Sequence, residues 1–223
     1  MISVAIDGPA GAGKSTIARA VSAALGFLYV DTGALYRTIA LFVLRAGVDP
    51  ADRKAVASLL PQIHIRLAYQ NGVQEMYLGE ENVSGEIRTP VVSMAASAVA
   101  AQPEVRAFLL EEQRRFAREA NVLMDGRDIG TVVLPDATVK IFLTASAEVR
   151  ARRRYKELIE KGEKVSFEEV LRDVEARDYA DSHRAVAPLK QASDAVLADT
   201  GTLTLEESVE LIKKIITEKT ASM

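Results

Sequence analysis

The sequence contains no cysteine among its 223 residues. This absence excludes disulfide bonds, thiolate metal sites and a catalytic thiol. It is also compatible with the reducing conditions of the cytoplasm, where we expect this protein to be located.

Long apolar runs and an excess of basic residues are also missing. No stretch approaches the roughly 20 uninterrupted apolar residues that cross a bilayer, and Met1-Ile2-Ser3 shows no basic leader, so we expect neither an export signal nor a membrane partner. The formal net charge of −3 argues against broad nucleic-acid binding. Arginines nevertheless crowd locally between residues 150 and 184, which favours a small anionic ligand.

The composition, with 48% apolar and 26% charged residues, is typical of a compact globular domain. Its most informative segment is residues 8–15, which read Gly-Pro-Ala-Gly-Ala-Gly-Lys-Ser and match the phosphate-binding pattern G-x-x-x-x-G-K-[ST] in full. A loop around a polyphosphate turns its backbone N–H groups inward, which glycine permits sterically. The pattern predicts a binding site for a nucleoside triphosphate, which the resemblance described below implies is ATP, formed by Gly8, Pro9, Ala10, Gly11, Ala12, Gly13, Lys14, Ser15 and Thr16.

Within this loop we expect Lys14, with a solvent-facing side chain, to reach the β- and γ-phosphates and Ser15 to ligate Mg²⁺. An apolar strand is predicted over residues 2–6 and an amphipathic helix over 15–25. This order is the one that the pattern requires, because the helix N-terminus then faces the phosphates. The alternative is a glycine-rich turn that binds nothing.

Further short apolar runs alternate with helical segments. A helix is predicted over residues 34–45, and strands over residues 27–30, 122–124, 139–143 and 195–198. Alternation of this kind favours a parallel sheet with helices on both faces, and ligands bind beyond the carboxyl ends of its strands. Asp31 and Asp125 follow two of those strands.

Two segments interrupt the alternation. Residues 63–83 predict an antiparallel hairpin with its turn at Gln70-Asn71-Gly72, and residues 147–184 predict a charged helical flap with a break at 161–163. The flap closes over the site, or it is simply a solvated surface. We therefore expect one domain over 1–223, with a core of about 1–60, 120–146 and 185–223, an insert of about 61–119 and a lid of about 147–184.

Polar clusters follow two predicted strands. Residues 31–37 read Asp-Thr-Gly-Ala-Leu-Tyr-Arg, and residues 125–131 read Asp-Gly-Arg-Asp-Ile-Gly-Thr. Arg37 and Arg127 could hold a second phosphate through bidentate bonds, or form structural salt bridges to Asp31 or Asp125. Asp125 either binds Mg²⁺ through water or supports Arg127.

These two clusters, the phosphate loop, Val-Ser-Gly-Glu-Ile-Arg at 83–88 and His-Arg-Ala-Val-Ala-Pro at 183–188 resemble the bacterial cytidylate kinases. The resemblance covers essentially the whole chain. It implies an α/β fold of the P-loop NTPase type, with a small β-containing insert that binds the nucleoside monophosphate and a helical lid. It also implies transfer of a phosphoryl group from ATP, with Mg²⁺, to CMP or dCMP.

Individual roles follow from the same resemblance. Arg37, Arg127 and Arg184 are similar to the acceptor-phosphate clamp, Ser97 and Arg106 to the cytosine-binding pair with Asp128 nearby, and Arg177 and Asp181 to the pair at the sugar and lid. Thr32 stands where some members carry Ser, and Arg153 belongs to the lid arginines that meet ATP. The residues expected to act in catalysis are Lys14, Arg127, Arg184 and Asp128.

Other interpretations of these residues remain open. Arg177, Asp181 and Arg184 have the spacing of one helical face and could form a surface salt-bridge ladder, and Ser97 could be a small residue packed in a helix. The whole chain could be another P-loop kinase for AMP, UMP, dTMP or shikimate, or a nucleotide-dependent regulatory switch. The sequence lacks the Asn-Lys-x-Asp pattern of guanine-binding switches. We expect a monomer whose partners are its small-molecule substrates, with no nucleic acid.

Overall fold

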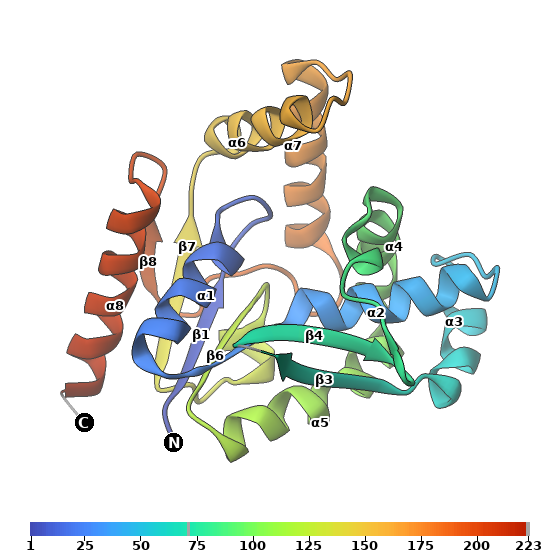
Figure 1. The fold of residues 1–223 in the computed structure, drawn as a ribbon, viewed down its shortest axis with the longest axis horizontal. Coiled ribbons are helices and arrows are strands. Elements are labelled where there is room, and N and C mark those ends of the chain that lie inside the picture. Colours follow the sequence, from blue (N-terminus) through green and yellow to red (C-terminus); the bar gives the residue numbers. More distant parts are fainter. Residues whose placement is uncertain (71, 222–223) are drawn as a thin grey trace. The chain divides into compact units, whose positions relative to one another are not determined.

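The computed structural model describes residues 1–70 and 72–221 (Figure 1). The chain forms two compact units, of which the first contains residues 1–29 with 120 onward and the second contains Val30–Glu119. The second unit begins before the predicted insert, so it also contains the helix that we expected in the core.

A five-stranded sheet organises the first unit, with the strand order β2-β6-β1-β7-β8. β1 pairs in parallel with β6 and β7, and β7 pairs in parallel with β8. The predicted α/β class with a parallel sheet is confirmed. The unit boundary falls within β2. The strands are β1 (Ser3–Asp7), β2 (Leu28–Asp31), β6 (Val122–Gly126), β7 (Val139–Thr144) and β8 (Val196–Asp199).

Helices α1 (Lys14–Leu25) and α8 (Leu205–Ala221) pack against this sheet. Their apolar faces meet the strands in one buried cluster, in which Ile17 and Val21 of α1 and Ile212 of α8 join Val4 and Ile6. The central strands β1 and β6 are buried on both sides, as expected for a parallel sheet. This packing fixes the strand end from which the phosphate loop emerges.

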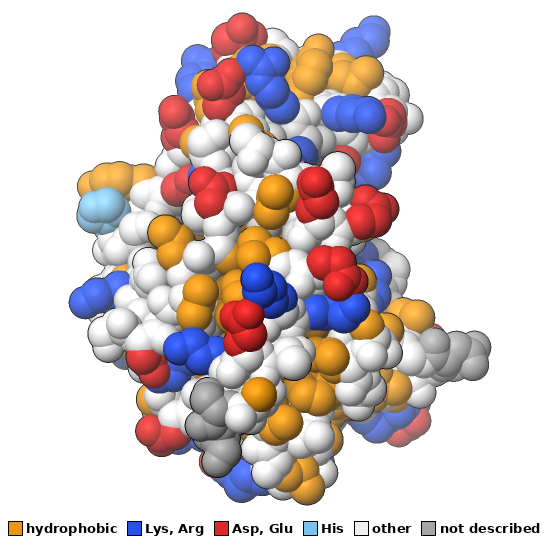
Figure 2. All heavy atoms as spheres, turned by 90° about the vertical axis from the view of Figure 1, so that its left-hand side faces the viewer, with side chains coloured by type: hydrophobic (Ala, Val, Ile, Leu, Met, Phe, Trp, Pro, Cys, Tyr) orange, Lys and Arg blue, Asp and Glu red, His pale blue; other side chains and the backbone are white. Residues whose placement is uncertain are grey.

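The predicted helical flap consists of α6 (Ala147–Glu160) and α7 (Phe167–His183). Ser166 and Glu169 form a reciprocal capping box at the start of α7. The two helices share a small buried cluster of Ala151, Leu158 and Val170. Figure 2 shows basic and acidic side chains intermingled over this part, at the top of the view.

The second unit combines helices with a three-stranded antiparallel sheet in the order β3-β4-β5. The predicted hairpin is confirmed, although Asn71 of its predicted turn lies outside the described residues. The elements are α2 (Thr32–Arg45), α3 (Arg53–Leu59), β3 (Ile65–Gln70), β4 (Val73–Leu78), β5 (Glu81–Asn82), α4 (Pro90–Ala100) and α5 (Pro103–Glu119).

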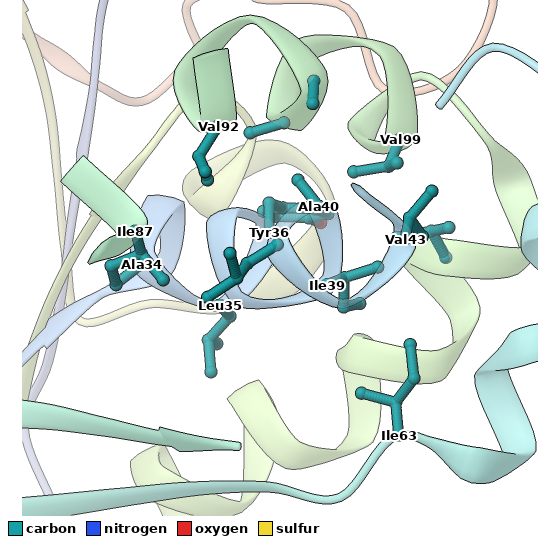
Figure 3. Packing of buried hydrophobic residues seen from close by; sticks show 14 of the residues in the cluster. Ala34, Leu35, Tyr36, Ile39, Ala40, Val43, Ile63, Ile87, Val92 and Val99 are labelled. Carbon is teal, nitrogen blue, oxygen red and sulfur yellow. The ribbon is translucent and has the colours of Figure 1, made fainter. Parts of the chain in front are cut away.

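Helix α2 lies at the centre of this unit's core (Figure 3). Leu35 and Ile39 of α2 are fully buried, and Val92 and Val99 of α4 belong to the same cluster. The helix starts two residues earlier than predicted because Asp31 caps it, accepting a hydrogen bond from Ala34 N at 3.0 Å.

No range was predicted for helices α3, α4, α5 and α8, or for three short helical segments: η1 (Leu60–Gln62), η2 (Glu86–Arg88) and η3 (Ile129–Val133). η3 is a π-helical turn, in which Leu134 N donates to Ile129 O at 2.7 Å. Such turns often mark functional sites. Among the described residues, no helix is long and apolar enough to cross a membrane.

Candidate active site

The phosphate loop joins β1 to α1 and depends on its glycines. A Cβ atom on Gly8 would lie 1.9 Å from the carbonyl oxygen of Leu143, so any side chain there would collide with β7. Gly13 stands at the N-cap of α1 with φ of 88°, a conformation that side chains rarely adopt. The loop is thus held close against the sheet, with the start of α1 at its end.

Lys14 is the buried cation of this loop. Its side chain is only 5% exposed, and Nζ donates to the carbonyl oxygen of Pro9 at 2.8 Å. Burial lowers its pKa to about 7, and the positive charge of Arg127 acts in the same direction. The prediction of a solvent-facing Lys14 is therefore wrong, because the side chain folds back over its own loop.

Ser15 and Asp125 meet next to the loop, although 110 positions separate them in sequence. Ser15 Oγ donates to Asp125 Oδ2 at 2.8 Å, and Tyr29 Oη donates to Oδ1 at 2.9 Å. Two hard oxygen donors suit Mg²⁺, which takes one or two carboxylates and fills its remaining positions with phosphates and water. Within the described residues no cluster of three or more acidic, His or Cys side chains could bind a metal by itself.

Arg127 and Arg184 are each paired with a carboxylate. Arg127 Nε donates to Asp181 Oδ2 at 2.8 Å, and Arg184 Nη2 lies 3.4 Å from Asp128 Oδ1. Asp128 is almost completely buried. Each of these two ion pairs thus joins residues that are more than fifty positions apart in sequence.

The idea that Arg177, Asp181 and Arg184 share one helical face is wrong for the last of them. α7 ends at His183, and Arg184 is already in an extended conformation with ψ of 142°. Arg177 lies on α7 and is exposed.

A strained residue positions Arg184. Ala187 has a positive φ of 48°, and its carbonyl oxygen accepts a hydrogen bond from Arg184 Nε at 2.6 Å. Such conformations are costly for residues other than glycine and cluster at functional sites. In the amino-acid sequence, only Pro188 after Ala187 indicates a turn at this point.

Two arginines of the lid, Arg150 and Arg153, differ in their hydrogen-bond partners. Arg150 is 4% exposed and donates to Ala145 O and Ala10 O, while its guanidinium pairs with Asp178 of α7. Arg153 donates to Thr200 O at 2.8 Å, and its Nη1 lies 3.9 Å from the point where a Cβ on Gly13 would be. Arg150 therefore binds lid and loop together, whereas Arg153 lies beside the phosphate loop.

The second unit contains the other predicted site residues. Arg37 Nη2 lies 2.8 Å from Asp31 Oδ2, the structural salt bridge that was one interpretation of Arg37. Arg106 is 8% exposed and donates to Ala100 O at 3.0 Å. Thr32 is buried at the start of α2, and Ser97 is exposed on α4 rather than packed in the core.

The sequence analysis missed Asp7, the last residue of β1. Its carboxylate accepts hydrogen bonds from Ile129 N at 2.8 Å and Gly130 N at 2.7 Å. Burial raises its pKa to about 6, against the lowering effect of these bonds. The rule that singled out Asp31 and Asp125, an acidic residue directly after a buried strand, applies equally to Asp7.

Comparisons with known proteins show the family of this chain. A model of the cytidylate kinase family matches residues 4–218. The chain is 49% identical over 216 residues to the cytidylate kinase of Carboxydothermus hydrogenoformans, covering 97% of each chain. It is 50% identical over 218 residues to that of Desulfitobacterium hafniense, covering 98% of this chain and 94% of the relative.

Among solved structures, an uncharacterised protein from Eubacterium ventriosum has a similar fold, with a TM-score of 0.53 at 12% identity. The match covers 97% of this chain and 99% of that one. At this identity the likeness concerns the fold alone. The family match and the relatives, however, span nearly the whole chain, and the chain therefore belongs to the cytidylate kinase family.

Proposed function

We propose that this protein transfers the γ-phosphoryl group of ATP to CMP or dCMP, forming ADP and CDP or dCDP. One observation carries the proposal. In a chain of this family, a complete phosphate loop and two carboxylate-paired arginines, Arg127 and Arg184, belong to the same compact unit. Two anion-binding groups are what a phosphoryl transfer between nucleotides needs.

The donor half of the site is assigned to the loop. Backbone N–H groups of residues 8–16 bind the phosphates of ATP, and Lys14 exchanges the Pro9 carbonyl for phosphate oxygens. Arg153, beside Gly13, contacts the donor phosphates from the lid. Ser15 directly, and Asp125 through water, would hold Mg²⁺, which neutralises charge on the β- and γ-phosphates when bound.

The acceptor half is assigned to the arginines. A phosphate monoester carries nearly two negative charges at neutral pH and binds guanidinium groups bidentately. Arg127 and Arg184 are paired with Asp181 and Asp128, and the phosphate of CMP would take the place of these two carboxylates. Arg37 would also bind the phosphate, which would replace Asp31 as the partner of its guanidinium group.

Ser97 and Arg106 are assigned to cytosine. A guanidinium only donates hydrogen bonds, so it pairs with the N3 and O2 acceptors of cytosine but meets the N3–H donor of uracil. Asp128 would accept from the exocyclic amine, the group by which cytosine differs from uracil. Leaving a buried polar group unpaired is costly, and this cost is the basis of the expected discrimination.

Catalysis then consists of positioning and charge stabilisation. Arg127 and Arg184 orient the acceptor phosphate, Lys14 stabilises the charge on the transferring group, and Arg177 and Asp181 act at the sugar of the acceptor. The phosphate oxygen is already a nucleophile once it is deprotonated, so no residue is assigned as general base.

Initial rates with CMP, dCMP, UMP, AMP, dTMP and shikimate test this function. We expect a clear preference for CMP and dCMP, and the loss of activity on addition of EDTA. A preference for any other acceptor would replace the substrate assignment. Slow ATP hydrolysis without transfer to any of these acceptors, together with a nucleotide-dependent protein partner, would favour a regulatory switch.

Replacing Arg184 tests the clamp. Arg184→Ala should raise the KM for CMP at least about tenfold, the scale of a lost charged hydrogen bond, with little change in the KM for ATP. Arg115→Ala is the matched control, because Arg115 forms exposed pairs with Glu112 and Glu119 on α5. Equal effects of Arg184→Ala on both KM values would contradict its role at the acceptor. The Mg²⁺ requirement, the monomeric state and the cytoplasmic location stay predictions.

A further inference from the structure

Asp7 forms two hydrogen bonds that none of the proposed roles uses. It lies at the carboxyl end of β1, is 5% exposed, and accepts from the backbone N–H groups of Ile129 and Gly130, 122 and 123 positions further along the chain. These two residues open the π-helical turn η3. Asp7 therefore joins the strand before the phosphate loop to the segment that carries Arg127 and Asp128.

The bonds replace a missing local cap. The first N–H groups of a helical segment find no acceptor within it, and a preceding Asp normally accepts one of them. Asp128 occupies that position before η3 but forms no capping bond with its side chain. Its carboxylate lies against Arg184 Nη2 instead, at 3.4 Å. Asp7 thus caps η3 from β1, while the carboxylate of Asp128 pairs with Arg184.

The held segment has little room to move. A Cβ atom on Gly130 would lie 3.2 Å from Lys140 Cδ and 3.4 Å from Asp7 Oδ2. Gly126, just before Arg127, is fixed by the pairing of β6 with β1. The residues Arg127 and Asp128 are therefore tied on one side by the sheet and on the other by Asp7.

We infer that Asp7 is a positioning residue for the acceptor phosphate, acting through the backbone of Ile129 and Gly130 on the neighbouring Arg127 and Asp128. The inference rests on the proposed function, since it assumes that these arginines bind CMP. It assigns Asp7 no contact with either substrate. Its loss should accordingly affect the acceptor more than the donor.

Asp7→Asn in the full chain tests this role. The amide keeps the size of the side chain but replaces one acceptor oxygen with a donor, so one of the two N–H groups loses its partner. We expect faster hydrogen exchange at Ile129 or Gly130, a KM for CMP raised about tenfold, and a KM for ATP changed by less than about twofold. Asp52→Asn is the matched control, because Asp52 also caps a helix through two backbone N–H groups, in the other unit.

Several results would overturn the inference: unchanged exchange at both residues, an unchanged KM for CMP, or an equal rise of both KM values. Should the wild-type protein not phosphorylate CMP, the proposed function fails, and the exchange rates still show whether Asp7 holds η3. Should Asp7→Asn not fold, Gly130→Ala displaces the same segment by crowding Lys140 and Asp7. Gly130→Ala should then raise the KM for CMP while leaving the KM for ATP nearly unchanged. Equal effects on the two KM values, or no effect on either, would contradict the inference.

Discussion

Lys14 and Asp7 are opposite charges on either side of the phosphate loop, and both are only 5% exposed. Burial acts on them in opposite directions, lowering the pKa of Lys14 and raising that of Asp7, because it disfavours the charged form of each. Both groups thus lack most of their solvation. Asp7, Asp125 and Asp181 supply negative charge near Lys14, and a bound polyphosphate would add to it.

Lys14→Ala should lower kcat by roughly 100-fold or more, the scale of losing a pre-organised donor to developing charge. Thermal stability should change little, because the lost Pro9 hydrogen bond is offset by removal of a buried cation. Steady-state kinetics and a melting curve measure the two effects. Lys156→Ala, at a side chain 79% exposed, is the control that should leave both unchanged. An unaltered kcat in Lys14→Ala would refute the assignment of the loop.

The raised pKa of Asp7 should make the free energy of unfolding depend on pH. Its pKa of about 6 in the folded protein exceeds the ordinary value of 3.8, so the folded state binds the proton more tightly than the unfolded state. Its stabilising contribution is present below about pH 4 and is lost as the pH rises to about 6. Urea unfolding between pH 4 and 7 should show the difference between wild type and Asp7→Asn falling by up to about 3 kcal/mol. A difference that does not vary with pH would contradict the raised pKa.

At the scale of elements, the two charged helices of the lid are held together by a small apolar cluster and a buried ion pair. α6 and α7 share few apolar contacts, and the buried Arg150 of α6 pairs with Asp178 of α7 while donating to the phosphate loop at Ala10 O. A buried guanidinium that loses its carboxylate is strongly destabilising, because the remaining charge stays desolvated.

Asp178→Asn should therefore lower the free energy of unfolding by about 2 kcal/mol, less than for a fully buried pair because Asp178 is 26% exposed. Glu157→Gln is the control, since Glu157 forms an exposed pair with Arg154 and should cost at most about 0.5 kcal/mol. Urea unfolding measures both. Equal stability of the two variants would show that the Arg150 pair contributes no more than a surface pair.

The predicted strands were confirmed, but the amphipathic helices α5 and α8 were given no range. The strand around residues 122–124 was found as a short apolar run, and the hairpin strands were found from two apolar segments on either side of a turn signal. η3 was not predicted because no sequence pattern near residues 129–133 indicates a π-helical turn. Its first two N–H groups donate to Asp7, which is distant in sequence. The start of α2 was placed late because Asp31 was considered as a site residue and not as a cap.

For the whole molecule, charge decides which partners are excluded. With a formal net charge of −3, the protein should not bind single-stranded RNA measurably at 0.15 M salt, since such binding requires basic surfaces that release counterions. Fluorescence anisotropy with a labelled oligonucleotide tests this, with a fluorescent ATP analogue as the positive control. Binding of RNA at a strength near that of ATP would overturn the expectation that small nucleotides are its ligands.

The phosphate loop, the parallel sheet and the resemblance to the cytidylate kinases could be predicted, because each depends on residues that are adjacent in the chain or form apolar segments of regular length. Only the folded chain shows which charges are buried and which groups pair across long distances in sequence, as Asp7 does with Gly130 and Arg127 with Asp181. Those pairs depend on the order of the strands in the sheet, which brings segments that are distant in sequence next to one another. Burial of Lys14 likewise arises only when the loop packs against the completed sheet.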